Sequence, residues 1–347
     1  MIVQEILGPR DKQVLEAVVI DYIRTGDPVG SRTVAKKYIT DVSPATIRNV
    51  MADLEELNLL YRPHASAGRV PTALGWRYYI DSILTINELA KRDREKIKKA
   101  YEGSPKEIQT ILRATSRILS ELSKQAAVVL LPKLSQTIFK RIQFVRVNQN
   151  RVLTILVAES GIVQSFLVHI DEDISQDELN KYSRYLSESL KGLSLLEVKK
   201  RILKEMEEER ILFDRLLRKA IELSKKALQV GLDETDIVIE GQTNLLNYPE
   251  FSDVEQMKKL LATFEEKTKI IRLLDKCLSS EGVHIILGSE AEFQDVQDMS
   301  LISSTYSRGG DILGALGVIG PTRMDYSRII PLVDYTAKLL SQIFEDE

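Results

Sequence analysis

The chain has 347 residues, of which 44% are hydrophobic and 29% charged, a balance typical of a soluble folded protein and not of a disordered chain. Its length predicts two or three domains at about 150 residues each, and its charge-free runs are too short for the roughly 18–20 residues of a membrane helix. The net charge of −3 gives no overall sign of nucleic-acid binding, so any such signal must be local.

Residues 1–85 combine short amphipathic segments with five of the ten prolines, which predicts short elements joined by tight turns. Asp11–Arg24 has the apolar spacing of a helix, and Ser31–Tyr38 predicts a second, shorter one. Ser43 followed by Pro44 is typical of a helix start, and the apolar spacing then continues to about Leu57.

Two strand-like segments follow the third helix, Leu59–Tyr61 and the residues around Val70. Ala65–Gly68 lies between them and predicts a glycine-containing turn. Three helices followed by a hairpin predict a winged helix-turn-helix, with the hairpin as its wing.

Residues 86–108 are rich in charge and predict a solvated helical connector, followed by a capping box at Ser104–Glu107 and a helix to about Lys124. Three β-rich runs separated by turn residues then predict an antiparallel meander between residues 142 and 168. Ser175–Glu178 is a second capping box.

A mainly helical block extends from that capping box to about Gln229 and includes the charged run Lys199–Arg210. Strand-like and helical segments follow to the C-terminal end. These are a strand at Ile237–Glu240, a helix capped at Ser252–Glu255, strands at Val283–Leu287, Leu301–Tyr306 and Ile312–Ile319, and a helix at Tyr326–Phe344. Strands interrupted by helices and then resumed predict one α+β domain with another inserted into it.

The third helix carries residues suited to reading DNA. Its apolar residues Ile47, Met51 and Leu54 define a buried face. The outward residues near its start are Ala45, Thr46, Arg48, Asn49 and Ala52. Arginine can bridge guanine O6 and N7, asparagine can bridge adenine N6 and N7, and small methyl groups can touch thymine. Ser43 and the free N–H groups of the first turn could hold a phosphate.

The predicted wing concentrates positive charge, because Leu57–Ile80 contains Arg62, His64, Arg69 and Arg77 but no acid. Residues 1–82 as a whole balance at ten basic and ten acidic residues. We expect a tight turn at Gly68 to leave Arg69 projecting toward DNA. An ordinary surface helix and a protein-docking module remain alternatives, since winged helices also bind proteins.

Several motifs resemble the heat-inducible transcription repressor family (HrcA) of bacteria. They are Pro28–Arg32, Ser43–Asn49, Met51–Glu55, Pro63–Thr72, Gly241–Phe251 and Tyr306–Tyr326. The resemblance spans nearly the whole chain. Asn58 departs from the glycine expected in the family, but asparagine tolerates the left-handed conformation that ends a helix.

This resemblance implies an α+β multidomain protein. It implies a winged helix-turn-helix at 1–85, a discontinuous GAF-like domain at 86–170 and 273–347, and an inserted, mainly helical dimerising domain at 171–272. It also implies a homodimer that represses chaperone operons at an inverted-repeat operator in double-stranded DNA, with the chaperonin GroEL as modulator. The residues and the resemblance together predict DNA contacts. These are Ser31, Arg32, Ser43, Ala45, Thr46, Arg48, Asn49, Arg62, His64, Ser66 and Arg69.

Other features predict structure and not chemistry. The glycine-rich residues 309–320 lack the pattern of a nucleotide-binding loop and predict a closely packed strand pair. His169 and His284 lie in apolar runs and are expected in the core, as is Cys277. We therefore predict no enzyme, no cofactor and no metal site, and the single cysteine favours a cytoplasmic location.

Two other functions stay open at this level. The GAF-like domain could bind a metabolite that gates the regulator, although no convergent polar pocket is apparent. An enzyme that uses the winged helix only for docking would need a nucleophile–base pair or a metal-ligand spacing, and neither is found.

Overall fold

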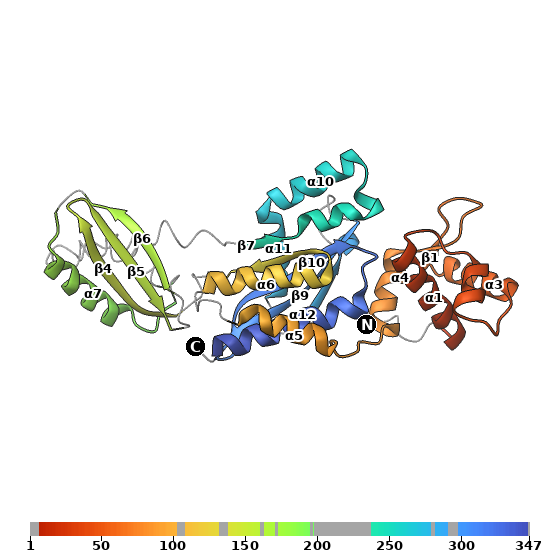
Figure 1. Ribbon diagram of the computed structural model, residues 1–347, viewed down its shortest axis with the longest axis horizontal. Helices are drawn as coiled ribbons and strands as arrows, with labels where there is room; N and C mark the ends of the chain where they lie inside the picture. Colours follow the sequence, from red (N-terminus) through yellow and green to blue (C-terminus); the bar gives the residue numbers. More distant parts are fainter. Residues whose placement is uncertain are drawn as a thin grey trace.

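The computed structural model shows an α+β protein with an N-terminal helical unit, a five-stranded sheet flanked by helices and a second, three-stranded sheet (Figure 1). The structure describes residues 7–102, 108–131, 138–159, 163–170, 173–194, 197, 237–278, 282–290 and 298–345. Within these residues, no helix has the length and apolar character needed to cross a membrane.

The N-terminal unit contains the helices and the hairpin that the sequence predicts. Its elements are α1 (Pro9–Thr25), α2 (Ser31–Lys37), α3 (Pro44–Glu56), β1 (Leu60–Tyr61), β2 (Val70–Pro71) and α4 (Ala73–Tyr78), continued by a π-helical turn at Tyr79–Ile83. Strands β1 and β2 pair antiparallel. The apolar faces of α1, α2 and α3 pack together because their residues recur at helical spacing.

The ends of α3 follow local rules that the sequence already shows. The Ser43 Oγ accepts the Thr46 N–H at 3.2 Å, and Pro44 occupies the first turn, where a missing N–H costs nothing. Asn58, just beyond the helix, has φ 57°, so it takes the left-handed conformation in which the family's glycine was expected.

The body of the protein is built around the five-stranded sheet, whose strand order is β7-β3-β10-β9-β8 with every pairing antiparallel. The strands are β3 (Ala126–Leu130), β7 (Ile237–Glu240), β8 (Val283–Leu287), β9 (Met299–Arg308) and β10 (Asp311–Pro321). Alternate residues of β3 belong to two cores: Ala127 and Val129 face one layer, and Ala126 and Val128 face the other.

Helices cover both faces of this sheet. Helices α6 (Ile108–Ser123) and α12 (Tyr326–Glu345) share the core of Ala127 and Val129, and α10 (Val254–Glu265) and α11 (Lys267–Cys277) share the other core. Short 3-10 helices at Gln242–Asn247, Pro249–Phe251 and Gly288–Glu290 connect these elements.

Helix α5 (Lys91–Tyr101) corrects the expectation of a purely solvated connector. Ile97 on its inner face is fully buried, and the Arg94 guanidinium lies 5.8 Å from the centre of the Tyr335 ring on α12. The charged residues around them keep the outer face in water. One apolar stripe is therefore enough to dock this helix on the body.

The glycine-rich segment forms the β9–β10 hairpin, which confirms its structural interpretation. Gly309 and Gly310 have positive φ at the turn. A Cβ at Gly314 would lie 2.5 Å from the Tyr306 Oη and 2.6 Å from the Leu130 carbonyl oxygen, so close packing in the sheet requires glycine there.

The second sheet, with order β4-β5-β6, is the predicted meander. It consists of β4 (Phe139–Asn148), β5 (Arg151–Ala158) and β6 (Val163–His169), with α7 (Gln176–Leu190) packed on one face. The Ser175 hydroxyl and the Glu178 carboxylate form the predicted capping box of α7. We call these four elements the β4–β6 unit.

The sheets divide the chain differently from the boundaries expected at 170/171 and 272/273. The β4–β6 unit has its own core, and the Phe139 N–H donates to the Leu193 carbonyl oxygen at 2.8 Å, which brings its two ends together. Residues 237–278 instead pack on the five-stranded sheet. The β-rich composition of a segment does not reveal which sheet it joins, because its pairing partners are distant in sequence.

Some predicted features lie outside the described residues. They are the capping box at 104–107, the charged run 199–210 and the rest of the helical block to residue 229. The cap of α10 is Asp253 and not Ser252, whose hydroxyl donates to the Pro249 carbonyl oxygen instead.

Candidate nucleic-acid interface

The start of α3 presents polar side chains to solvent, as the sequence predicts. Ile47 and Met51 are buried against the other helices of the N-terminal unit. Ala45, Thr46, Arg48 and Asn49 are exposed, and Ala52 is half-buried. The packing of one face therefore leaves a hydrogen-bonding face at the helix N-terminus, where a helix seated in a major groove contacts base edges.

Ser43 is exposed directly before these residues. Its hydroxyl is engaged by the helix itself, through the Thr46 N–H and through the Thr46 hydroxyl at 2.9 Å. The remaining first-turn N–H groups and the positive end of the helix dipole favour an anion at this corner.

A cleft of about 410 Å³ lies between α3, the start of α2 and the loop that joins β1 to β2. Four arginines line it, and we call it the arginine cleft: Arg32, Arg48, Arg62 and Arg69. Ser31 and Ser66 line it as well. Arginine is suited to phosphate because its guanidinium offers several fixed donors and stays charged at all physiological pH values.

Arg69 does not project from the hairpin, so that expectation is wrong. Its side chain is 6% exposed, and its Nη2 lies 2.7 Å from the Glu55 Oε2. That contact is an ion pair without hydrogen-bond geometry, and the Nε also has no hydrogen-bond partner within the described residues. Arg69 thus forms the floor of the arginine cleft and keeps donor capacity unused.

Backbone pairing explains why Arg69 turns inward. Its N–H donates to the Val29 carbonyl oxygen at 2.8 Å, and the Val29 N–H donates back to the Arg69 carbonyl oxygen at 2.9 Å. A Cβ at Gly68 would lie 2.4 Å from the Val29 carbonyl oxygen. Gly68 is therefore needed for close approach to the α1–α2 connection, and not for a projecting tip.

The exposed basic residues of the β1–β2 loop are Arg62 and His64. The Arg62 Nη1 donates to the Ala65 carbonyl oxygen at 3.4 Å, and its Nη2 lies 4.0 Å from the Glu55 carboxylate. Ser66 is exposed beside them, and Arg32 is exposed on α2. Ser31, also predicted as a DNA contact, is only 9% exposed and lines the arginine cleft.

Arg77 is the third arginine that the sequence placed at the wing, and the structure places it elsewhere. It lies on α4, where its Nε donates to the Glu290 Oε1 at 2.8 Å and its Nη2 to the Ile285 carbonyl oxygen at 3.1 Å. Glu290 and Ile285 belong to the body, so this side chain faces the body and not the wing.

Glu55 is a site residue that sequence reasoning missed. It pairs with Arg69 and reaches Arg62, so its carboxylate neutralises part of the arginine cleft. Its spacing of seven residues from Arg48 places both on one side of α3, and this spacing was the available signal.

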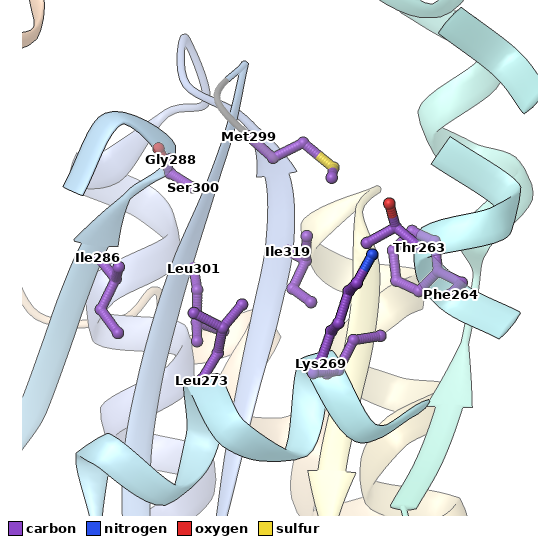
Figure 2. Close-up of a pocket in the computed structure, with 11 residues that line it drawn as sticks. Thr263, Phe264, Lys269, Leu273, Ile286, Gly288, Met299, Ser300, Leu301 and Ile319 are labelled. Atoms are coloured by element: carbon purple, nitrogen blue, oxygen red, sulfur yellow. The ribbon is translucent and has the colours of Figure 1, made fainter. Parts of the chain in front are cut away.

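One apolar cavity of the body is too small for a metabolite. It lies under α10 and α11 and has a volume of about 20 Å³, space for about one water molecule. Figure 2 shows its labelled side chains arriving from the sheet and from the two helices. Its Lys269 ammonium lies 2.9 Å from the Glu266 carboxylate, and its Ser300 hydroxyl accepts a hydrogen bond from the Tyr326 hydroxyl. A metabolite could therefore enter this cavity only if α10 or α11 moved.

The remaining candidate residues do not form a reactive site. His169 is exposed and His284 is half-buried, which corrects the expectation that both lie in the core. Cys277 is buried as expected, and burial raises the pKa of its thiol. Its Sγ accepts a hydrogen bond from the Ser303 hydroxyl at 3.0 Å. Within the described residues no group of three potential metal ligands occurs.

A helical N-terminal unit with a small sheet and an arginine cleft, carried on a larger α+β body, is an arrangement suited to a transcription regulator. The family model described as "HrcA protein C terminal domain" matches residues 109–330. The chain is 53% identical to the heat-inducible transcription repressor HrcA of Syntrophobacter fumaroxidans, over 98% of each chain. It is 48% identical to that of Geobacter sulfurreducens, over 98% of this chain and 99% of the relative. The chain therefore belongs to the heat-inducible transcription repressor (HrcA) family, whose members are regulators and not enzymes.

One solved structure shares the fold over its whole length. It is described as "Crystal structure of a hypothetical protein at 2.2 A resolution", with a TM-score of 0.64 and 22% sequence identity over 98% of this chain and 99% of that one. The arrangement of units seen here is therefore not peculiar to this sequence.

Proposed function

We propose that this chain represses heat-shock chaperone operons by binding an inverted-repeat operator as a homodimer. In this proposal the N-terminal unit is a winged helix-turn-helix, with α3 in the major groove and the β1–β2 hairpin as wing. The observation that carries it is the exposed N-terminal face of α3, with Arg48 and Asn49, beside the arginine cleft. Base-edge readers and phosphate-binding cations thus lie on one surface.

The charge of the arginine cleft supports the same partner. Four guanidinium groups line a cleft whose nearest acidic contact is the partly exposed Glu55. Local positive charge on a chain of net charge −3 concentrates attraction for a polyanion at this surface. Duplex DNA supplies closely spaced phosphates along its axis, and their contacts position the protein without reading sequence.

We assign the remaining units by the same family relationship. The five-stranded body corresponds to the GAF-like domain, and the β4–β6 unit belongs to the inserted dimerising domain. On the sheet face opposite α7, the strand register aligns Val145 with Leu153 and Leu167, and Val157 with Val163, while Gln143 and Ser165 flank Ile155 between these rows. Leu167 is 53% exposed in the single chain, so this face offers apolar surface for a second copy.

Binding to an inverted repeat against a scrambled duplex of equal composition tests the proposal. The purified full-length chain is titrated into both at several salt concentrations. We expect the repeat to bind at least ~10³-fold more tightly than the scrambled duplex, with both affinities falling as salt rises. Equal affinity for the two duplexes would contradict the proposal.

The proposed modulator is tested separately. Folded proteins hold only about 5–15 kcal/mol of stability, so moderate warming can deplete a binding-competent population. We propose that GroEL returns the unfolded chain to this population. After a mild heat pulse, the fraction that binds the operator should recover more fully with GroEL and ATP than with an inert protein. Identical recovery in the two samples would count against this part of the proposal.

A further inference from the structure

Arg323 joins the N-terminal unit to the body. It lies in the turn between β10 and α12, and its side chain is 8% exposed. Its Nη1 donates to the Ile23 carbonyl oxygen on α1 at 3.1 Å, and its Nη2 donates to the Glu250 Oε2 at 3.0 Å. The same guanidinium lies 5.3 Å from the centre of the Tyr248 ring. One cation therefore connects three segments that are far apart in sequence.

The end of α1 is shaped to receive this cation. Gly26 caps the helix with φ 74°, and its N–H donates to the Tyr22 carbonyl oxygen at 2.8 Å, which leaves the Ile23 carbonyl free for Arg323. A Cβ on Gly26 would lie 3.2 Å from the Arg323 Cζ. A helix C-terminus favours a positive charge, so Arg323 completes the end of a helix that belongs to the other unit.

Arg77 makes the reciprocal connection, from α4 to Glu290 and the Ile285 carbonyl oxygen of the body. Trp76 precedes Arg77 on α4 and is 4% exposed. Its ring centre is 5.8 Å from that of Tyr326 on α12 and 6.3 Å from that of Tyr22 on α1. Buried apolar residues continue through this contact, so both units share one hydrophobic core. We call Trp76, Arg77, Tyr326 and Arg323 the joint.

We propose that Arg323 and Arg77 are positioning residues for operator binding. They hold the N-terminal unit in one orientation on the body, so that a dimer presents its two α3 helices at a set spacing and rotation. This inference rests on the proposed binding of an inverted repeat by a homodimer. It also gives a role to two family-like segments, Gly241–Phe251 and Tyr306–Tyr326, whose side chains meet at the joint.

The physical reason is preorganisation. A dimer whose N-terminal units are fixed in orientation binds its second half-site as an intramolecular event at high effective concentration, but only when the half-sites match its geometry. N-terminal units on a loosened joint reach many half-site spacings, and the affinity gained at each spacing is smaller. The joint therefore sets both the advantage of a full repeat over a half-site and the preference for one spacer length.

The test uses full-length Arg323→Met, Arg323→Lys and Arg77→Met on a half-site duplex and on inverted repeats whose spacers differ in length. We expect half-site affinity to stay within about twofold of the parent, because α3 is unchanged. On the best repeat, Arg323→Met should lose on the order of tenfold, and its spacer preference should flatten. The affinity of Arg323→Lys for this repeat should lie between those of the parent and Arg323→Met, since lysine keeps the charge but lacks the planar guanidinium.

A matched control and a direct readout keep the test decisive. Arg328→Met removes an α12 arginine whose hydrogen bond goes to the Leu122 carbonyl oxygen within the body, and it should behave like the parent. Trp76 is the single tryptophan, so its emission reports the joint itself and should shift to the red and become more quenchable in Arg323→Met.

Two results would overturn the inference. One is an unchanged spacer preference in the Arg323 and Arg77 variants. The other is an equal loss on half-site and full repeat, which would mean that the arginines only support folding of the N-terminal unit. A parent that gains nothing from a full repeat over a half-site would instead contradict the proposed function, so the two failures are distinguishable.

Discussion

Arg48 is the side chain for which the account makes its most specific claim. It is exposed at the start of α3, lines the arginine cleft and has no intramolecular hydrogen bond or ion pair within the described residues. A free guanidinium at this position is available to bridge the two acceptors of a guanine without breaking a contact inside the protein.

Arg48→Ala should therefore weaken operator binding by about 1–3 kcal/mol and relax base preference at one position in each half-site. Fluorescence anisotropy on the operator and on single-base variants measures both effects. Arg92→Ala, which removes an exposed arginine from α5 on the body, serves as the matched control. Undiminished discrimination at every base position would show that Arg48 does not read DNA.

Arg62 and Arg69 are predicted to behave differently although both line the arginine cleft. Arg69 is buried beside Glu55, so Arg69→Ala leaves that carboxylate without its closest partner and should lower the free energy of unfolding by roughly 1–3 kcal/mol. Arg62 is exposed, so Arg62→Ala should change stability by less than about 0.5 kcal/mol. Urea unfolding of both variants checks this difference.

DNA binding should separate the same two variants in the opposite order, with the larger loss of affinity in Arg62→Ala. Removing the exposed Arg62 is expected to weaken binding to all sequences similarly and to reduce the salt slope by about 1. If instead Arg62→Ala unfolds more easily than Arg69→Ala, the burial described here does not hold in solution.

At the scale of elements, the contact of the β1–β2 loop with the α1–α2 connection decides the shape of the arginine cleft. Gly68→Ala would push a Cβ against the Val29 carbonyl oxygen and break the pairing of Arg69 with Val29. Overpacking of this kind costs about 1–3 kcal/mol. We expect a lower melting temperature and faster amide exchange at Arg69, measured against the exposed neighbour Ser66→Ala. Parent-like exchange in Gly68→Ala would contradict this role.

Elements determined by neighbouring residues could be predicted from the sequence. The start of α3 follows from Ser43 and Pro44, and the close packing of the β9–β10 hairpin follows from its glycines. The direction of Arg69 could not be predicted in this way, because it depends on a backbone pairing with Val29, 40 residues earlier. Arg77 was misplaced for the same reason, since its partner Glu290 is supplied by another part of the fold.

At the scale of the whole molecule, the sequence predicted that strands would be interrupted and resumed, but not where the sheets divide. The turn chemistry of the meander is visible locally, whereas its separation from β3 depends on which strands pair. The joint could not be predicted from the sequence either. Arg323, Glu250 and Ile23 come from three regions and meet only in the folded chain.

The proposed dimer makes its own prediction at this scale. Leu167→Asp places a charge on the sheet face opposite α7, where Leu167 is 53% exposed, so the single chain should tolerate it while the dimer should not. Sedimentation analysis should then show monomers. Val254→Asp changes a residue that is 61% exposed at the start of α10 and should leave the dimer intact. A stable Leu167→Asp dimer would place the interface elsewhere.

Cleavage of operator DNA from the start of α3 tests the central claim most directly. A cysteine introduced as Thr46→Cys can carry an iron chelate that cuts nearby DNA, while Cys277 stays unlabelled because it is 1% exposed and its thiol pKa is raised. If α3 of each subunit lies in a major groove, cuts should appear at two positions related by the symmetry of the repeat. An absence of cuts on an operator that is demonstrably bound, or cuts in one half-site only, would contradict it.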